Sequence, residues 1–279
     1  MKIEDVMSTD LIVGYVPGTV KDALRTLAKN NVSGMPILKK GTKTVVGVVT
    51  RTDIFRNADE EQLALIMSDK IHFVEKDQSV KDAAKLLYNN RIHGLPVINK
   101  RKHLIGIISP TDILKVLSER NNDLAEKYFT NIVVPVYKET PLNIVMEIIN
   151  ITNENALPVL NDELKVIGIV SDGDLFKLSH VKESVSRLEM GIGDDEDQWT
   201  WEGIRDTIRL YYSTSKVDLP SVPVKQVMVT NVIKAFKNTP IKEIAKNMIK
   251  NKISHMPVVD ESDRLVGMVT DIDLMACMF

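Results

Sequence analysis

The chain has 279 residues, 44% of them hydrophobic and 27% charged, with a formal net charge of −2. A chain of this length is expected to form two globular units with hydrophobic cores. It contains no apolar run of about 18 residues and no hydrophobic signal region after Met1, so we expect a soluble protein without a membrane span that stays in the cytoplasm. Its single cysteine, Cys277, excludes an internal disulfide and a thiolate zinc cluster.

A two-part motif occurs four times along the chain. The first part reads VSGMPIL from residue 32, IHGLPVI from 92, ENALPVL from 154 and ISHMPVV from 253. The second part reads VVGVVTRTDI from 45, LIGIISPTDI from 104, VIGIVSDGDL from 166 and LVGMVTDIDL from 265. Successive motif prolines are 60, 62 and 99 residues apart, and each precedes its motif aspartate by 16 or 17 residues. This spacing predicts four structural repeats, each too small to be stable alone, that share cores in pairs.

Each copy gives the same order of predicted elements. A helix begins near Thr19, Ser79, Thr140 or Thr239, which are suitable N-cap residues, with Pro141 and Pro240 expected at the first helical position. Two β-branched runs follow, separated by a polar turn, and the second closes in [ST]-x-x-D, the spacing of a capping box that opens another helix. With a strand before the first helix, every copy is predicted as β-α-β-β-α, and the fold class as α+β.

The spacing of the copies also divides the chain into two pairs. The predicted first pair is 1–120, with repeats 1–60 and 61–120, and the predicted second pair is 121–279, with repeats 121–180 and 221–279. The longer interval before the fourth copy places an insertion at 181–220.

The insertion is expected to be helical and acidic. Residues 189–206 hold seven acidic residues and one basic residue, which leaves the rest of the chain at +4. Trp199 and Trp201 are expected to anchor the insertion to the body or to face a protein partner. The mild positive excess elsewhere is too small to indicate a nucleic-acid surface by itself, but it allows an anionic small ligand.

The four [ST]-x-x-D ends are the strongest candidate for chemistry. A hydroxyl and a carboxylate are placed where a strand meets a helix N-terminus, beside unpaired backbone N–H groups and the positive end of the helix dipole. There a carboxylate can accept hydrogen bonds from a ribose diol, and the hydroxyl and N–H groups favour a phosphate. The alternative is that these residues only cap the helix, because capping boxes are common.

Cations stand close to these ends, but no catalytic set does. Arg51, His93 and His255 adjoin the predicted strand ends and could contact phosphate. The phosphate-binding loop, dinucleotide-binding, zinc-protease and serine-hydrolase motifs are all absent from the sequence. The five histidines are scattered, so we expect neither a metal site nor an enzyme.

The repeated motif resembles the CBS domain, the module named after cystathionine β-synthase. The resemblance rests on h-x-x-[ML]-P-[VI]-h followed by hhGhh-[ST]-x-x-D-[IL], and it covers nearly all of the chain except 180–220. The segment RIHGLPVI at 91–98 is similar to RIHRLPVI in the regulatory gamma subunit of AMP-activated protein kinase and its prokaryotic, in particular archaeal, relatives. The resemblance implies four CBS repeats in two pairs, each pair formed about a pseudo-twofold axis, which assemble into a flat disc with up to four clefts near its centre.

The resemblance also assigns ligand contacts, and these are expectations for this chain. The ribose carboxylates would be Asp53, Asp112, Asp174 and Asp273, with the hydroxyls Thr50, Ser109, Ser171 and Thr270. Adenine contacts would come from Val13, Phe73, Val134 and Ile233, and less securely from Val32, Ile92, Asn155 and Ile253. The kinase subunits contact phosphate with a His-Arg pair. Here His93 keeps the histidine and Gly94 replaces the arginine, whereas Ser254 and His255 stand at these places in the fourth copy.

The leading hypothesis is a non-catalytic sensor that binds AMP, ADP or ATP and regulates an unknown partner protein. A second hypothesis keeps the adenosine site but takes S-adenosylmethionine or methylthioadenosine as the ligand. A third is a nucleic-acid-binding or assembly scaffold whose capping boxes are purely structural. No catalytic cofactor is expected, nucleic acid is the less favoured partner, and the resemblance allows a homodimer of discs.

Overall fold

The computed structural model describes residues 1–57, 60–120, 122–175, 178, 220 and 222–279. The predicted insertion, with Trp199 and Trp201, therefore lies outside the described residues except for Pro220. No helix in the described ranges is long and apolar enough to cross a membrane.

Each of the first three repeats contains a three-stranded sheet. In the first repeat the elements are β1 (Gly14–Val16), α1 (Val20–Asn30), β2 (Gly34–Lys39), β3 (Val45–Thr50) and α2 (Arg51–Arg56). In the second they are β4 (Val74–Glu75), α4 (Val80–Asn90), β5 (Leu95–Ile98), β6 (Leu104–Ile108) and α5 (Pro110–Arg120). In the third they are β7 (Val136–Tyr137), α6 (Leu142–Thr152), β8 (Ala156–Leu160) and β9 (Val166–Ser171), followed by helical residues 172–175. In every sheet the first strand pairs parallel with the second, and the second pairs antiparallel with the third.

The fourth repeat departs from the predicted β-α-β-β-α order at both ends. It contains α9 (Ile241–Asn251), β10 (His255–Val259), β11 (Leu265–Thr270) and the 3₁₀ helix η4 (Asp273–Met278). Its expected first strand is reduced to a parallel bridge between Ala235 and Val258. Its last helix has 3₁₀ geometry, with the tighter i→i+3 bonding of short helices, as in the 3.0 Å bond from the N–H of Met275 to the carbonyl of Ile272.

Capping residues set the start of the first helix in each repeat. Thr19 and Ser79 cap α1 and α4, as the sequence predicts, and accept the N–H groups of Asp22 and Asp82 at 3.1 Å. The prediction for the other two helices was wrong by one residue. Pro141 and Pro240 are themselves the N-caps of α6 and α9, because their extended ψ of 145° and 140° lies outside the helical range.

The segment that opens each repeat packs on the other repeat of its pair. These four arms contain η1 (Ile3–Asp5), α3 (Leu63–Ile66), η2 (Ala125–Lys127) and η3 (Val224–Gln226). Bridges join the arms to the third strand of the neighbouring repeat at Ser8–Ile107, Ser68–Val48, Thr130–Met268 and Val229–Ile169. Each pair therefore exchanges arms, which ties its two repeats together through backbone hydrogen bonds.

The glycine of each hhGhh strand makes room for an exchanged arm. Side chains of the arms cover these glycines in the pairs Met7–Gly106, Met67–Gly47, Phe129–Gly267 and Met228–Gly168, and a β-carbon on any of the glycines would collide with its partner. Each covering residue stands 29 positions before the motif proline of its own repeat. The repeated glycine thus serves a contact between repeats rather than a turn.

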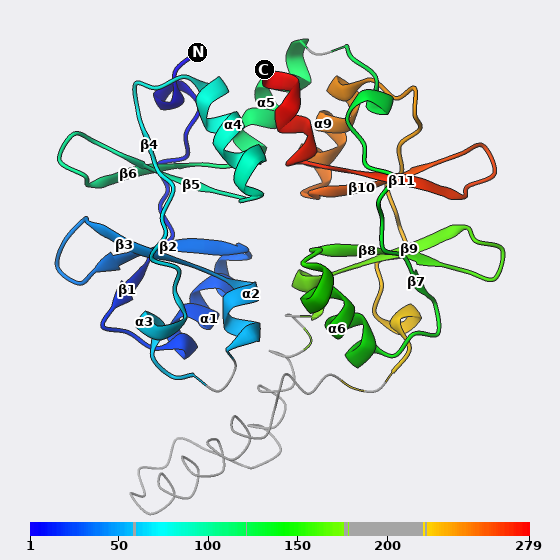
Figure 1. Cartoon of the computed structure of the whole chain (residues 1–279), viewed down its shortest axis with the longest axis horizontal. Helices are drawn as coiled ribbons and strands as arrows, with labels where there is room; N and C mark the ends of the chain where they lie inside the picture. The colour runs from blue at the N-terminus through cyan, green and yellow to red at the C-terminus, as the bar shows by residue number, and fades with distance from the viewer. Residues whose placement is uncertain (58–59, 121, 176–177, 179–219, 221) are drawn as a thin grey trace, which may run out of the picture.

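The repeats lie at the four corners of a flat disc (Figure 1). One large core cluster joins the second and fourth repeats through α4, α5, α9 and η4, whereas the first and third repeats have separate clusters. The arms contribute buried residues to the neighbouring cores, among them Ile3, Leu63, Ala125 and Val224. Figure 1 shows the helices turned toward the middle of the disc and the hairpins at its two outer ends.

Candidate ligand site at the strand–helix junctions

A hydroxyl and a carboxylate meet at the end of the third strand in every repeat. One carboxylate oxygen, Oδ2, accepts both the hydroxyl and the backbone N–H of the residue three positions earlier. The hydroxyl distances are 2.6 Å for Thr50–Asp53, 2.8 Å for Ser109–Asp112, 2.6 Å for Ser171–Asp174 and 2.7 Å for Thr270–Asp273. The four N–H distances lie between 2.8 and 3.1 Å. In all four repeats Oδ2 is therefore engaged by the residue three positions earlier, and only Oδ1 can distinguish the aspartates as ligand groups.

The partners of Oδ1 divide the four carboxylates into two kinds. Oδ1 of Asp112 lies 3.1 Å from Lys115 Nζ and 3.3 Å from Ser8 Oγ, which belongs to an exchanged arm. Oδ1 of Asp273 accepts Arg91 Nη1 at 2.7 Å. Within the described ranges, Oδ1 of Asp53 and Oδ1 of Asp174 accept no hydrogen bond. The junctions of the first and third repeats are thus the better prepared to accept a diol.

The two parts of the motif lie side by side in space. The residue after each cap hydroxyl donates its N–H to the loop before the second strand, with distances of 2.9 Å for Arg51–Ser33, 3.0 Å for Asp172–Asn155 and 2.8 Å for Asp271–Ser254. The second repeat has Pro110 at this place, which has no N–H to donate. In the first repeat this pairing holds Arg51, which the sequence singled out, beside the loop before β2.

The contact between the two pairs in this region is polarised by charge. The first pair supplies cations: Arg91 Nη1 donates to Asp273 at 2.7 Å, and Arg56 Nη2 donates to Asn153 Oδ1 at 3.0 Å. The second pair supplies the acceptors. We call the residues Arg51, Arg91, His93, Glu154, Asn155, Asp172, His255, Asp271 and Asp273 the central cluster. Arg91 adopts a φ of 52°, the left-handed conformation of a helix C-cap, which Asn31, Asn153 and Lys252 adopt at the equivalent places.

His93 contacts both repeats of the second pair. Its Nε2 lies 3.1 Å from Asn155 Nδ2, and its Nδ1 lies 3.7 Å from Asp271 Oδ1. Burial lowers the pKa of His93, but the nearby carboxylate of Asp271, with a further contribution from the charge of Asp172, outweighs it, so the pKa is raised overall. The raised pKa shifts His93 toward the protonated form relative to a free imidazole. Nε2 can accept a hydrogen bond from Asn155 Nδ2 only while Nε2 carries no proton.

Asp271 of the central cluster is buried, and Asp172 is partly buried. Asp271 is 6% exposed, and its Oδ1 has no hydrogen-bond donor among the residues that the structure describes. Burial raises the pKa of Asp172, although the charge of Arg51 opposes the shift. Gly173 allows Arg51 to approach, because a β-carbon there would lie 2.7 Å from Arg51 Nη1.

His255 is buried as a neutral side chain. Burial is the main cause that lowers the pKa of this imidazole to about 4, against the opposing charge of Asp271. The unfolded chain takes up a proton below about pH 6.5 and the folded chain does not, so acid favours unfolding. We expect His255 to remove about 2 kcal/mol from the free energy of unfolding between pH 7 and pH 5, at about 1.4 kcal/mol per pKa unit.

Urea unfolding of the wild type and His255→Gln at both pH values measures this effect. The loss on acidification should be about 2 kcal/mol smaller in the variant, whereas His72→Gln, at an exposed histidine, should behave as the wild type does. His93 has the opposite sign, since its raised pKa favours the folded state below about pH 6.5, but it is present in all three proteins. Equal losses in the wild type and His255→Gln would contradict the account.

The residues expected to contact adenine differ in burial. Val134, Ile233, Val32, Ile92 and Ile253 are partly buried and pack against the core clusters. Val13 is also partly buried, whereas Phe73 is 49% exposed. Asn155 contacts His93 rather than lining an apolar surface. The structure thus brings together the residues expected to contact phosphate and ribose more clearly than those expected to contact adenine.

Several contacts of the site had no signal in the motif. Neither the contacts of Ser8 and Lys115 with Asp112 nor the ion pair of Arg91 with Asp273 could be expected from the motif. The constant 29-residue spacing of the arm residues could have revealed the exchange that places Ser8 there. No group of three or more candidate metal ligands occurs among residues 1–57, 60–120, 122–175, 178, 220 and 222–279.

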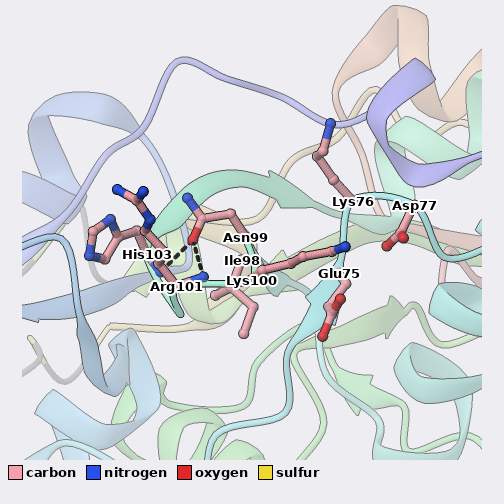
Figure 2. A pocket seen from close by; sticks show the side chains of 8 residues that line it. All are labelled: Glu75, Lys76, Asp77, Ile98, Asn99, Lys100, Arg101 and His103. Carbon is pink, nitrogen blue, oxygen red and sulfur yellow. Dashed lines mark hydrogen bonds between the residues drawn. The ribbon is translucent and has the colours of Figure 1, made fainter.

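A hollow of about 330 Å³ lies at the outer end of the disc, away from these junctions. Figure 2 shows its lining, which comes from the turn after β4 and the β5–β6 loop: Glu75, Lys76, Asp77, Ile98, Asn99, Lys100, Arg101 and His103. None of the expected ligand residues lines it. The hollow lies at the β5–β6 hairpin and shares no residue with the central cluster.

Comparison with known proteins agrees with this architecture. The sequence model of the CBS domain matches residues 3–60, 62–119, 125–181 and 224–279. Protein MJ1225 of Methanocaldococcus jannaschii is 24% identical over 288 residues, which cover 95% of this chain and 94% of that protein. Its crystal structure, described as that of a candidate archaeal homologue of the gamma subunit of AMP-activated protein kinase, aligns over 100% of both chains with a TM-score of 0.80 and 21% identity.

Two further solved structures align with all or part of this chain. An uncharacterized conserved protein from Pyrococcus horikoshii aligns over 100% of both chains with a TM-score of 0.68 and 22% identity. CBSX2 of Arabidopsis thaliana, solved in complex with AMP, covers 41% of this chain and 94% of its own, with 26% identity and a TM-score of 0.39. The full-length alignments show that the four-repeat disc is shared.

Proposed function

Because the chain belongs to the CBS domain family, we propose that it is a non-catalytic adenine-nucleotide sensor that acts in the cytoplasm and regulates a partner protein. The observation that carries the proposal is the pair of capping carboxylates, Asp53 and Asp174, whose Oδ1 atoms accept no hydrogen bond in the described part of the chain. Each is held rigidly by its cap, so that its second oxygen is fixed in place for a ribose diol.

The proposed binding mode uses one strand–helix junction for each nucleotide. The ribose hydroxyls would donate to Oδ1, with the partly buried apolar residues beside the junction against the adenine. The phosphates would extend toward the centre of the disc, where Arg51 and His93 are the cations. Asp112 and Asp273 would bind ribose only after giving up Lys115 or Arg91, so we rank their junctions lower.

Regulation would act through the contact between the two pairs. A ligand shifts a conformational equilibrium only by its difference in affinity for the two states. Phosphates that engage Arg51 or His93 would change the contacts of these cations with the second pair. Nucleotide binding would thereby alter how the two halves of the disc are presented to a partner.

One observation favours S-adenosylmethionine as a second candidate ligand. Asp271 carries a buried Oδ1 without a hydrogen-bond donor in the described chain, 3.7 Å from the nearest imidazole nitrogen of His93. A positively charged sulfonium beside it would be electrostatically favourable, whereas a phosphate would be repelled. Nothing comparable supports a nucleic-acid scaffold.

Thermal unfolding with separate ligands tests the proposed function. A ligand at one hundred times its Kd stabilises the folded state by about 2.7 kcal/mol, which corresponds to several degrees for a chain of this size. We expect such a rise with at least one of AMP, ADP and ATP and none with duplex DNA. A rise with S-adenosylmethionine or methylthioadenosine alone would replace the nucleotide with the second candidate, and a rise with DNA alone would contradict both.

A further inference from the structure

The central cluster carries more negative than positive charge. Arg51 and Arg91 face four carboxylates, those of Glu154, Asp172, Asp271 and Asp273, with His93 as a further, titratable cation. All the cations come from the first pair and all the carboxylates come from the second. A region that receives phosphates would be expected to carry the opposite balance.

Two of these carboxylates occupy equivalent places in the third and fourth repeats. Asp172 and Asp271 each follow the cap hydroxyl, and each donates its backbone N–H to the loop before the second strand. The same place holds Arg51 in the first repeat and Pro110 in the second. Their positions are fixed by backbone hydrogen bonds, so their charges cannot move far from the centre.

The side chains of both carboxylates interact with cations of the opposite pair. Asp271 lies 3.7 Å from His93, a distance at which the charges attract while Oδ1 keeps no hydrogen-bond donor in the described chain. Asp172 interacts with Arg51, for which Gly173 leaves room. Asp271 is buried and Asp172 is partly buried, so water screens these interactions less than it screens those of exposed charges.

We propose that Asp172 and Asp271 are specificity-determining residues that act as internal anions: they hold Arg51 and His93 when no ligand is bound, and a phosphate must displace them in order to bind. The chain would then favour adenosine ligands of low negative charge, AMP over ATP. The preference for AMP over ATP rests on the proposed function. The competition of the two carboxylates with a simple anion for Arg51 and His93 does not.

Binding of inorganic pyrophosphate to the full chain tests the competition directly. The signals of His93 and His255 report binding at the centre by NMR, and His93→Gln identifies the His93 signal. We expect Asp271→Asn and Asp172→Asn each to bind pyrophosphate about tenfold more tightly than the wild type, because each removes one charge and one competitor. Asparagine keeps the shape of aspartate, and two independent variants guard against misfolding of either.

Asp263→Asn is the matched control. It removes one negative charge and releases Lys234, its partner at 2.7 Å, but it does so at a hairpin away from the centre. Its φ of 68° also suits asparagine. Pyrophosphate affinity of this variant should stay within twofold of the wild type.

The outcomes separate the inference from the proposed function. Unchanged or weaker pyrophosphate binding in both central variants overturns the inference, as does an equal gain in Asp263→Asn. Adenosine, which has no phosphate, should bind the wild type and the central variants equally. Failure of adenosine and AMP to bind any of these proteins overturns the proposed function, while a tenfold gain for pyrophosphate would still support internal competition.

Discussion

Replacing Asp53 with alanine should weaken the binding of adenine nucleotides to the first repeat about a hundredfold. The carboxylate would accept two ribose hydroxyls, and a hydrogen bond to a charged group contributes about 1.5–3 kcal/mol. A loss of about 3 kcal/mol corresponds to roughly a hundredfold in Kd. Titration calorimetry of AMP with the wild type, Asp53→Ala and Asp174→Ala measures the effect at the two junctions whose Oδ1 atoms accept no hydrogen bond from the described residues.

Asp82→Ala separates the loss of ligand contact from the loss of a helix cap. Asp82 forms the same capping box with Ser79, with a hydroxyl distance of 2.6 Å, but at the start of α4 rather than at a strand–helix junction. Asp53→Ala, Asp174→Ala and Asp82→Ala should each lower the free energy of unfolding by about 0.5–2 kcal/mol. Only Asp53→Ala and Asp174→Ala should affect nucleotide binding, and an equal change in Asp82→Ala would mean that the aspartates act through stability alone.

Ile244→Ala should lower the free energy of unfolding by about 2–5 kcal/mol, the usual range when a fully buried isoleucine is truncated. Ile244 lies on α9, is 0% exposed and belongs to the core cluster that joins the second and fourth repeats. A cavity there removes contacts that hold the two pairs together, so the substitution should also weaken the disc as a unit. Urea unfolding followed by circular dichroism measures the change.

Ile151→Ala provides the control for Ile244→Ala. Ile151 also lies on a helix, α6, but is 75% exposed. The same change of side chain there should shift the free energy of unfolding by no more than about 0.5 kcal/mol. A loss under 1 kcal/mol in Ile244→Ala would contradict the shared core between the second and fourth repeats.

The parts of the fold that depend on local interactions could be predicted from the sequence. The bonds of Thr50 to Asp53 and of Thr270 to Asp273 join residues three positions apart, and the hydroxyl-to-carboxylate bond recurs in every repeat. The strands around each motif proline follow from β-branched runs and polar turns. Repetition strengthened each prediction, because the same motif with nearly the same spacing is not expected to occur four times by chance.

Contacts between repeats could not be predicted in this way. The arm exchange that places Ser8 on Asp112 joins residues 104 positions apart, and Arg91 and Asp273 are 182 apart. Such contacts leave no periodic pattern in the intervening sequence. The glycines of the hhGhh strands were visible as a repeat, but their role became clear only when arm residues such as Met67 were seen to cover them.

The fourth repeat shows the limit of reasoning by repetition. Its sequence keeps the motif, yet its first strand is a single bridge at Ala235 and its last helix has 3₁₀ geometry. The sequence correctly predicted that helices begin next to Pro141 and Pro240. It predicted these prolines as the first helical residues, whereas in the structure they are the N-caps of α6 and α9. The extended ψ angles of Pro141 and Pro240 exclude them from the helices, and composition does not reveal these angles.

The central claim, that this chain binds adenine nucleotides through its capping carboxylates, is tested most directly by calorimetric titration of AMP into the purified full chain and into the Asp53→Ala/Asp174→Ala double variant. The account predicts saturable binding by the wild type that falls about a hundredfold or more in the double variant while both proteins remain folded. Absence of AMP, ADP and ATP binding by the folded wild type, or equal affinity in the double variant, would contradict it.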